Sequence, residues 1–581
     1  MDAWVCTESN RLNWAKTHQA ELRADCYNGL QDAMGGELEH DARQLGRRII
    51  LPSTIPGTPR HMKQLYQDSM AICRHYGRAD FFITFTCNPK WDEITANLPP
   101  GFSSTDRPDI VARVFNLKLK ALLDDLLTKH VLGKPVADVY TIEFQKGGLP
   151  HAHILLILND EDKIRDVEFL DTIICAEIPD RNVDRDLYNV VTSNMLHGPC
   201  GVTHPKSPCM MNGKCSKRFP KQFSEETMAH EDGYPIYRRR EKINGEERKV
   251  QVKGIWLDNR WVVPYNPYLS KRYKAHINVE LCSSIGAFKY LFKYVFKGGD
   301  RTTAILQTDI NGQAVPRDVD EIADYLDARY VSAPEGGWRI LQFKMHHRYP
   351  AVQRLHIHLP NQQTVTFSND TDMVTFLNND RLQKTTLTEF FTANKQAARV
   401  APGPPTDDND CRKLLYQEFP TKMTWNRSQR RWNHRKSGFG GTIGRIYFVG
   451  PSGGERFYLR LLLTVVRGPT SFEDLHTFDS VLHDNFKSAC IARGLLDSDE
   501  QWDRSLAEAA LWQTGSQLRE LFVCILLHCQ PANPLQLWTD HAQSLSDDCR
   551  HQLRTIHQID DPSQEQVIIH FYSKSDFRSI H

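Results

Sequence analysis

The chain has 581 residues, of which 40% are hydrophobic and 25% are charged. This composition is that of a globular protein and excludes a wholly disordered or fibrous chain. The length suits roughly three or four domains. The formal net charge of +1 excludes a uniformly basic surface, so any attraction to nucleic acid must come from local clusters of cations.

The amino terminus does not have the basic and then apolar segments of a secretory signal. No apolar run approaches the roughly 18 residues that a membrane span needs. We therefore expect a soluble intracellular protein. Its 14 cysteines are then expected to be reduced thiols or metal ligands rather than disulfides.

The first half of the chain predicts an α+β domain. Residues 1–60 are expected to be helical and then loop-like. The next elements are predicted as a helix over 61–76, a strand over 81–86, a helix over 111–128 and two strands over 139–144 and 151–158. A turn with Gly147, Gly148 and Pro150 separates the last two strands and predicts a hairpin.

The character of the sequence changes at residues 194–265, where cysteines, prolines and basic residues replace periodic patterns. We interpret this segment as an insertion that something other than a large core organises. Later elements are a helix over 283–297, a strand over 364–367 and a proline-rich linker over 401–405. The expected parts are a helical and loop-like region 1–60, a sheet-containing domain 61–305, a mixed α/β extension 306–400, and a basic linker with a mainly helical region 401–581.

The most informative motif is Gly148-Leu149-Pro150-His151-Ala152-His153. Alternate side chains of a strand share a face, so His151 and His153 are predicted to project together. Glu143 precedes His151 by eight residues, and a hairpin would fold its carboxylate toward the imidazoles. A carboxylate with two imidazoles suits Mg²⁺ or Mn²⁺, and Gln145, on the face of Glu143, is the reserve ligand.

A second His-x-His sequence, His356-Ile357-His358, provides a comparison within the chain. At the offset that separates Glu143 from His151, this pair has Arg348 instead of a carboxylate, and no Gly-x-Pro sequence precedes it. Most strand histidines are ordinary structural residues. We expect the second pair to be structural.

The helix predicted over 283–297 contains Tyr290 and Tyr294, which are four residues apart and share a face. Three lysines flank the tyrosines, namely Lys289, Lys293 and Lys297. Most helical tyrosines are aromatics at the boundary between core and surface, and that is the alternative here, but cations beside a phenol attract phosphate and favour phenolate. Such a tyrosine can attack the phosphorus of a phosphodiester that a metal polarises, which gives a covalent phosphotyrosine.

A cluster of four plausible zinc ligands lies within 19 residues, at His197, Cys200, Cys209 and Cys215. His204 is a rival ligand. Zinc would order the basic stretch 214–221, which a small loop could not order by burial. The alternative is a set of buried free thiols, because the spacing fits no standard zinc finger closely.

Two further segments concern nucleic acid and nucleotide. Arg430, Arg431 and Trp432 lie in the basic stretch 427–436, where phosphate contact with base stacking is expected and a solvated loop is the alternative. The segment 450–456 looks like a phosphate loop but lacks the Lys-Ser/Thr end. We therefore expect no ATP site.

Together these residues are similar to the HUH endonucleases, and more closely to the Rep region of Helitron transposases, the helitron helicase-like domain of rolling-circle transposons. The resembling segments are 82–91, 143–156, 197–217, 288–298 and 325–335. The resemblance implies a central antiparallel sheet flanked by helices and a structural zinc in the insertion. It also implies a metal held by Glu143, His151 and His153, and cleavage of single-stranded DNA that leaves a 5′-phosphotyrosine and a free 3′-hydroxyl.

Two other readings stay open, a rolling-circle replication initiator or relaxase of the same chemistry, and a transposon-derived protein that binds DNA without cutting it. Helitron transposases usually carry a Pif1-type helicase after the Rep region, and nothing here matches it. The expected partners are single-stranded DNA at transposon ends and a separate helicase. A DNA substrate implies a nuclear location.

Overall fold

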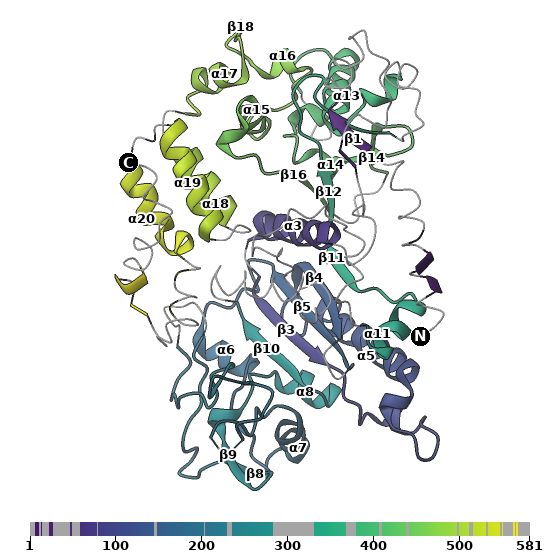
Figure 1. Ribbon diagram of the computed structural model, residues 1–581, viewed down its shortest axis with the longest axis vertical. Helices are drawn as coiled ribbons and strands as arrows, with labels where there is room; N and C mark the ends of the chain where they lie inside the picture. Colours follow the sequence, from purple (N-terminus) through teal and green to yellow (C-terminus); the bar gives the residue numbers. More distant parts are fainter. Residues whose placement is uncertain are drawn as a thin grey trace, which may run out of the picture. The chain divides into compact units, whose positions relative to one another are not determined.

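The computed structural model describes residues 59–77, 79–144, 148–202, 204–228, 235–282, 331–367, 379–405, 410–436, 441–496, 499–510, 515–529, 531 and 533–546, with short pieces at 6–7, 9–10, 13, 23–26, 47–48, 549, 553, 562–563 and 565–567. The chain divides into two compact units (Figure 1). The first comprises Met1–Thr17 and Ile50–Pro350, and the second comprises His18–Ile49 and Ala351–His581. The division at residue 350 passes through the expected 306–400 extension.

A five-stranded antiparallel sheet forms the centre of the first unit (Figure 1). Its strands, in spatial order, are β10 (Ile277–Leu281), β3 (Phe81–Thr86), β5 (Pro150–Leu158), β4 (Pro135–Phe144) and β11 (His346–Tyr349). The predicted α+β class and the predicted strands over 81–86, 139–144 and 151–158 are confirmed. β4 and β5 form the predicted hairpin, and Gly148 in its turn adopts a φ of +77°, which favours glycine.

One face of the sheet is apolar and is covered by helices. The main one is α5 (Pro108–Leu127), which starts with a proline at its first turn, where no backbone N–H is needed. Shorter helices complete the layer, namely α4 (Asp92–Thr95), α8 (Pro267–Tyr273) and α11 (Ala333–Ile340). Trp338 of α11 is fully buried, and its ring lies 5.9 Å from that of Phe115 and 5.1 Å from that of Phe343, centroid to centroid.

The opposite face of the sheet carries polar side chains, because alternate residues of a strand point to opposite sides. The register places Thr84 beside His153 and Thr86 beside His151. Helix α3 (Pro59–Tyr76) lies against this face at its β11 edge, where Asp68 forms an ion pair of 3.0 Å with Arg348. The predicted helix over 61–76 is therefore confirmed.

The insertion of residues 194–265 has short elements and a small core. Helix α7 (Arg185–Asn194) leads into it, and its strands are β6 (Met210–Met211), β7 (Lys214–Cys215), β8 (Lys249–Val252) and β9 (Ile255–Asp258). Its hydrophobic cluster consists of Ile178, Val191, Met195, Val262 and Tyr265. So few apolar side chains do not order some seventy residues by burial alone.

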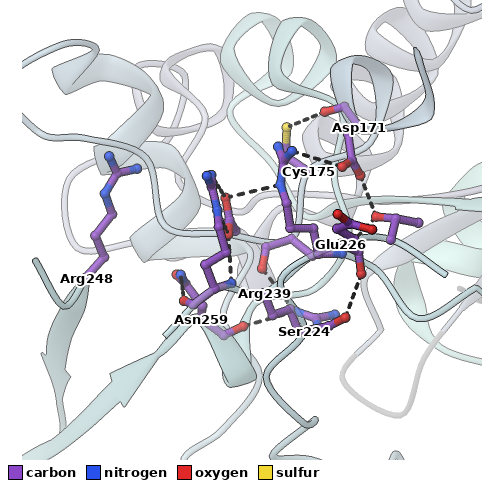
Figure 2. A network of polar contacts seen from close by, with 12 residues as sticks. Asp171, Cys175, Ser224, Glu226, Arg239, Arg248 and Asn259 are labelled. Carbon is purple, nitrogen blue, oxygen red and sulfur yellow. Dashed lines mark hydrogen bonds and ion pairs between the residues drawn. The ribbon is translucent and has the colours of Figure 1, made fainter. Parts of the chain in front are cut away.

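A buried polar network helps to order the insertion (Figure 2). The Nη1 atom of Arg239, whose residue is 3% exposed, lies 3.1, 3.1 and 2.6 Å from the carbonyl oxygens of Ala176, Asn259 and Val262 and donates to them. The Asn259 side chain accepts a hydrogen bond from the backbone N–H of Ile178. These bonds tie the insertion to the segment that precedes it, at Ala176 and Ile178.

The second unit is mainly helical, as expected for the carboxyl-terminal region. Its helices are α13 (Thr386–Val400), α14 (Phe419–Lys422), α15 (Glu455–Leu463), α16 (Phe472–Leu475), α17 (Phe486–Ala492), α18 (Glu500–Ala510), α19 (Gly515–Cys529) and α20 (Pro534–Leu545). β12 (Ala351–Leu355) pairs in parallel with β16 (Thr442–Ile446), and β13 (Thr364–Phe367) confirms the predicted strand over 364–367. None of the helices within the described ranges has the length and hydropathy needed to cross a membrane.

We predict that Trp338→Ala lowers the free energy of unfolding of the first unit by about 3–5 kcal/mol, because it leaves a large cavity between the sheet and α11. Denaturant unfolding followed by circular dichroism measures this change. Val183→Ala, at a side chain that is 85% exposed, is the control and should stay within about 0.5 kcal/mol of wild type. Equal effects of the two substitutions would contradict this account of the core.

Candidate functional site

The hairpin of β4 and β5 brings Glu143, His151 and His153 together on the polar face of the sheet. Glu143 lies directly opposite His151 in the register. The two imidazole centroids are 4.5 Å apart, and the Nε2 atom of His153 lies 3.1 Å from the Oε2 atom of Glu143. Two adjacent strands thus provide two nitrogen donors and one carboxylate.

Two threonines of β3 contact the imidazoles. The Thr86 Oγ1 atom lies 2.6 Å from the Nδ1 atom of His151, and the Thr84 Oγ1 atom lies 3.4 Å from the Nδ1 atom of His153. The Nδ1 contact of His151 leaves its Nε2 atom for another partner, whereas the Nε2 atom of His153 contacts Glu143. Such outer contacts orient the histidines of metal sites. Sequence reasoning missed both threonines, although their spacing of two in a strand is the same signal that identified the histidines.

Burial favours the uncharged form of His151. His151 is 6% exposed and His153 is 8% exposed. Burial, followed by the charges of His153, His276 and Lys217, holds the pKa of His151 well below its usual range. Neutral imidazole is the form that binds metal, so two imidazoles and one partly exposed carboxylate fit a divalent cation.

His153 lies close to both His151 and Glu143, but the ligand atoms of the three residues do not all lie close together. Within the part of the chain that the structure describes, the single group of three or more metal-binding side chains with all ligand atoms close together lies elsewhere, in the insertion. Gln145, the reserve ligand, lies outside the described residues.

The group in the insertion consists of His197, Cys200, Cys209 and Cys215. Their ligand atoms all lie within 4.8 Å of one another, and the Cys215 Sγ atom is 3.3 Å from the His197 Nε2 atom. Three sulfurs and one nitrogen at such distances suit a tetrahedral zinc ion, whose bonds are about 2.0–2.3 Å long. The cluster could therefore hold a metal such as zinc. His204, the rival ligand, is not part of it.

The thiols of this cluster differ in their acidity. Burial, with contributions from Cys209 and Cys215, raises the pKa of the Cys200 thiol to about 12. Burial also acts to raise the pKa of Cys215. Hydrogen bonds from the backbone N–H groups of Phe219 and Lys217, together with those of the Cys200 and Cys209 thiols, outweigh it and hold that pKa below its usual value. Backbone donors around a sulfur stabilise the thiolate, which is the form that binds zinc.

The predicted tyrosine helix lies outside the described residues. This applies to Tyr290 and Tyr294 and to the flanking Lys289, Lys293 and Lys297. The segment that carries them begins directly after β10, and β10 is the neighbour of β3, the strand of Thr84 and Thr86.

The basic stretch 427–436 lies in the second unit, on the hairpin of β14 (Met423–Asn426) and β15 (Arg431–His434). Arg431 is exposed, and the Nη1 atom of Arg430 donates to the carbonyl of Arg381 at 2.6 Å. Trp432 is only 7% exposed, because alternate residues of β15 face the core, and its Nε1 atom donates to the carbonyl of Thr386. The expected base stacking on Trp432 does not fit this structure.

The second histidine pair occupies a structural setting. The Nδ1 atom of His358 lies 2.9 Å from the carbonyl oxygen of Leu359, and its Nε2 atom lies 2.8 Å from the Thr385 Oγ1 atom. His356 contacts Thr386 through Nδ1 at 3.0 Å. Both ring nitrogens of His358 are occupied by protein groups, which agrees with the structural role expected for this pair.

We predict that Cys209→Ser removes zinc from the purified protein, because three ligands bind zinc far more weakly than four. Zinc content per chain, measured by atomic emission, checks this. His204→Ala is the matched control and should retain zinc, since His204 stands outside the cluster. Zinc loss in both variants, or in neither, would contradict the assignment of these four ligands.

The family model described as the Helitron helicase-like domain at the N-terminus matches residues 1–156, a range that includes Glu143, His151 and His153. A search of curated proteins gives no match. The chain therefore carries a Helitron helicase-like N-terminal region.

Proposed function

We propose that this chain is a metal-dependent endonuclease and strand transferase of the HUH type that acts on single-stranded DNA, as in Helitron transposition. The observation that carries the proposal is the grouping of Glu143, His151 and His153 on the polar face of the sheet. These residues lie within the range that matches the Helitron helicase-like domain. A cluster of this composition on rigid neighbouring strands is a suitable platform for a catalytic ion.

The proposed roles follow from the chemistry of each group. Glu143, His151 and His153 would hold Mg²⁺ or Mn²⁺, which when bound withdraws electron density from the oxygens of a phosphodiester. Thr84 and Thr86 would keep the two imidazoles oriented. The buried, neutral state of His151 means that no proton has to leave this ring before it binds a cation.

Tyr290 or Tyr294 would be the nucleophile. Its phenolic oxygen attacks phosphorus, the bond between phosphorus and the 3′-oxygen breaks, and the phenolic proton is lost while the 3′-oxygen gains one. The products are a 5′-phosphotyrosine and a free 3′-hydroxyl. Two tyrosines would let one site hold two strands during transfer, and the lysines at 289, 293 and 297 would attract the backbone.

The proposal extends to partners and location. A nuclease of single strands needs a DNA end or an unwound duplex, which a separate helicase would supply. Work on DNA would place the protein in the nucleus.

We predict that the protein, incubated with Mn²⁺ and labelled single-stranded DNA, forms an adduct that survives denaturation. The adduct should disappear in the double variant Tyr290→Phe, Tyr294→Phe, because the nucleophile is gone. His151→Ala should lower the rate of adduct formation by about 100-fold or more, since a metal ligand is lost. Denaturing gels with a 5′-labelled and a 3′-labelled strand measure the adduct and the released end.

His356→Ala is the matched control, because His356 belongs to the second His-x-His pair and is exposed. This variant should keep the wild-type rate. If wild-type protein binds the strand but gives neither adduct nor cleavage, the chain is a DNA-binding protein and the nuclease proposal is wrong.

A further inference from the structure

We propose that the outer face of the β8–β9 hairpin binds single-stranded DNA, with one base stacked on Trp256 and the backbone held by the cations beside this ring. This inference rests on the proposed function and deepens it, because it adds a strand-binding surface outside the candidate catalytic site. The surface, which we call the hairpin stripe, consists of Phe223, Lys249, Trp256, Asp258 and Arg260.

The turn of the hairpin fixes which side chains face outward. Lys253 and Gly254 join β8 to β9 with φ angles of +48° and +82°. Two successive positive φ angles are typical of the tight turns whose twist matches that of paired strands. The resulting register places Trp256 opposite Gln251. The next residue, Leu257, is fully buried, so strand alternation turns Trp256 toward solvent, where it is 58% exposed.

Charged side chains connect Trp256 to a second aromatic ring. The Nζ atom of Lys249 lies 5.8 Å from the centroid of the Trp256 ring, and Lys249 is paired across the strands with Asp258. Arg260 donates to the Asp258 carboxylate through Nε at 3.1 Å and Nη2 at 2.7 Å. The guanidinium of Arg260 lies 4.6 Å from the centroid of the Phe223 ring. Each member of the hairpin stripe is therefore next to another, and the stripe is continuous.

The composition of the hairpin stripe suits a single strand rather than a duplex. Residues 247–260 contain four cations and two carboxylates, which gives a net charge of +2. Part of this charge is neutralised locally, because Lys249 also pairs with Glu247 at 3.1 Å. The modest charge attracts phosphate, and the exposed ring offers a stacking face to any base. In a duplex the bases already stack on each other, so only a single strand can use Trp256.

Backbone hydrogen bonds connect the hairpin stripe to the Cys/His cluster and to the sheet. The carbonyl of Trp261, directly after the stripe, accepts a bond of 2.8 Å from the N–H of His197. Three residues before His197, the carbonyl oxygen of Asn194 lies 2.9 Å from the Nδ1 atom of His276. The His276 carbonyl accepts a bond of 3.0 Å from the N–H of Thr86 in β3. A strand on the stripe would thus be held by the unit that carries the candidate catalytic site.

The test measures the binding of a labelled single strand by anisotropy, without added Mn²⁺ or Mg²⁺. Trp256→Ala should weaken this binding about fivefold or more and leave the binding of a blunt duplex of the same sequence unchanged. Trp256→Phe, which keeps an aromatic ring, should retain most of the affinity. Phe102→Ala is the matched control, because Phe102 is an aromatic residue of the first unit that is 52% exposed and lies outside the stripe. It should bind as wild type does.

The contribution of the cations is measured by the dependence of affinity on salt. Lys249→Ala should reduce the log–log slope for the single strand by about 0.7, because one phosphate contact is lost. Lys249→Arg keeps the charge and should keep the slope.

A photo-crosslink locates the contact in wild-type protein, so this measurement does not depend on the folding of a variant. A single strand that carries iodouracil should, on irradiation, become attached to the tryptic peptide of residues 254–260. Trp256 is the aromatic residue of this peptide. Mass spectrometry identifies the peptide and the modified residue.

Equal single-strand affinities of Trp256→Ala and Phe102→Ala would overturn the inference. Equal losses on the single strand and the duplex would also overturn it, as would crosslinks that all lie outside residues 254–260. The adduct assay decides the nuclease proposal separately. If wild-type protein forms no adduct but binds the strand through Trp256, the nuclease proposal fails and the hairpin stripe stands. If it forms the adduct and Trp256→Ala binds as wild type does, only the hairpin stripe is wrong.

Discussion

The register of the β4–β5 hairpin is the constraint on which the candidate site depends. Glu143 lies opposite His151, so the carboxylate and both imidazoles face the same side of the sheet. A slip of one residue would turn Glu143 into the helix-covered core and face Ile142 toward the histidines. The apolar face prevents this slip, since Ile154 and its neighbours must stay under α5. The packing of the apolar face therefore fixes the positions of Glu143, His151 and His153 on the polar face.

The insertion is stabilised in a different way from the sheet. Its hydrophobic cluster is small, so buried polar contacts such as those of Arg239 help to order the insertion. The Cys/His cluster lies in the same insertion. A metal gives a short loop the rigidity that a core gives a domain. Because Asn194, His276 and Thr86 connect this loop to the histidine pair, rigidity in one place bears on geometry in the other.

Much of the site could be predicted from local patterns, and the rest depended on contacts between distant segments. Period-two spacing and a glycine turn were enough to place His151 opposite Glu143. Thr86 contacts His151 across 65 positions of sequence, which no local pattern specifies. Trp432 was misjudged because its cationic neighbours suggested a surface, whereas strand alternation turns it into the core.

The account proposes two different metal sites in the first unit, one on the sheet and one in the insertion. Crystals soaked in Mn²⁺ and measured at the manganese and zinc absorption edges test it most directly. The account predicts an anomalous manganese peak between Glu143, His151 and His153 and a separate zinc peak within the His197, Cys200, Cys209 and Cys215 cluster. Manganese absent from the sheet, or present only at the cysteines, would contradict it.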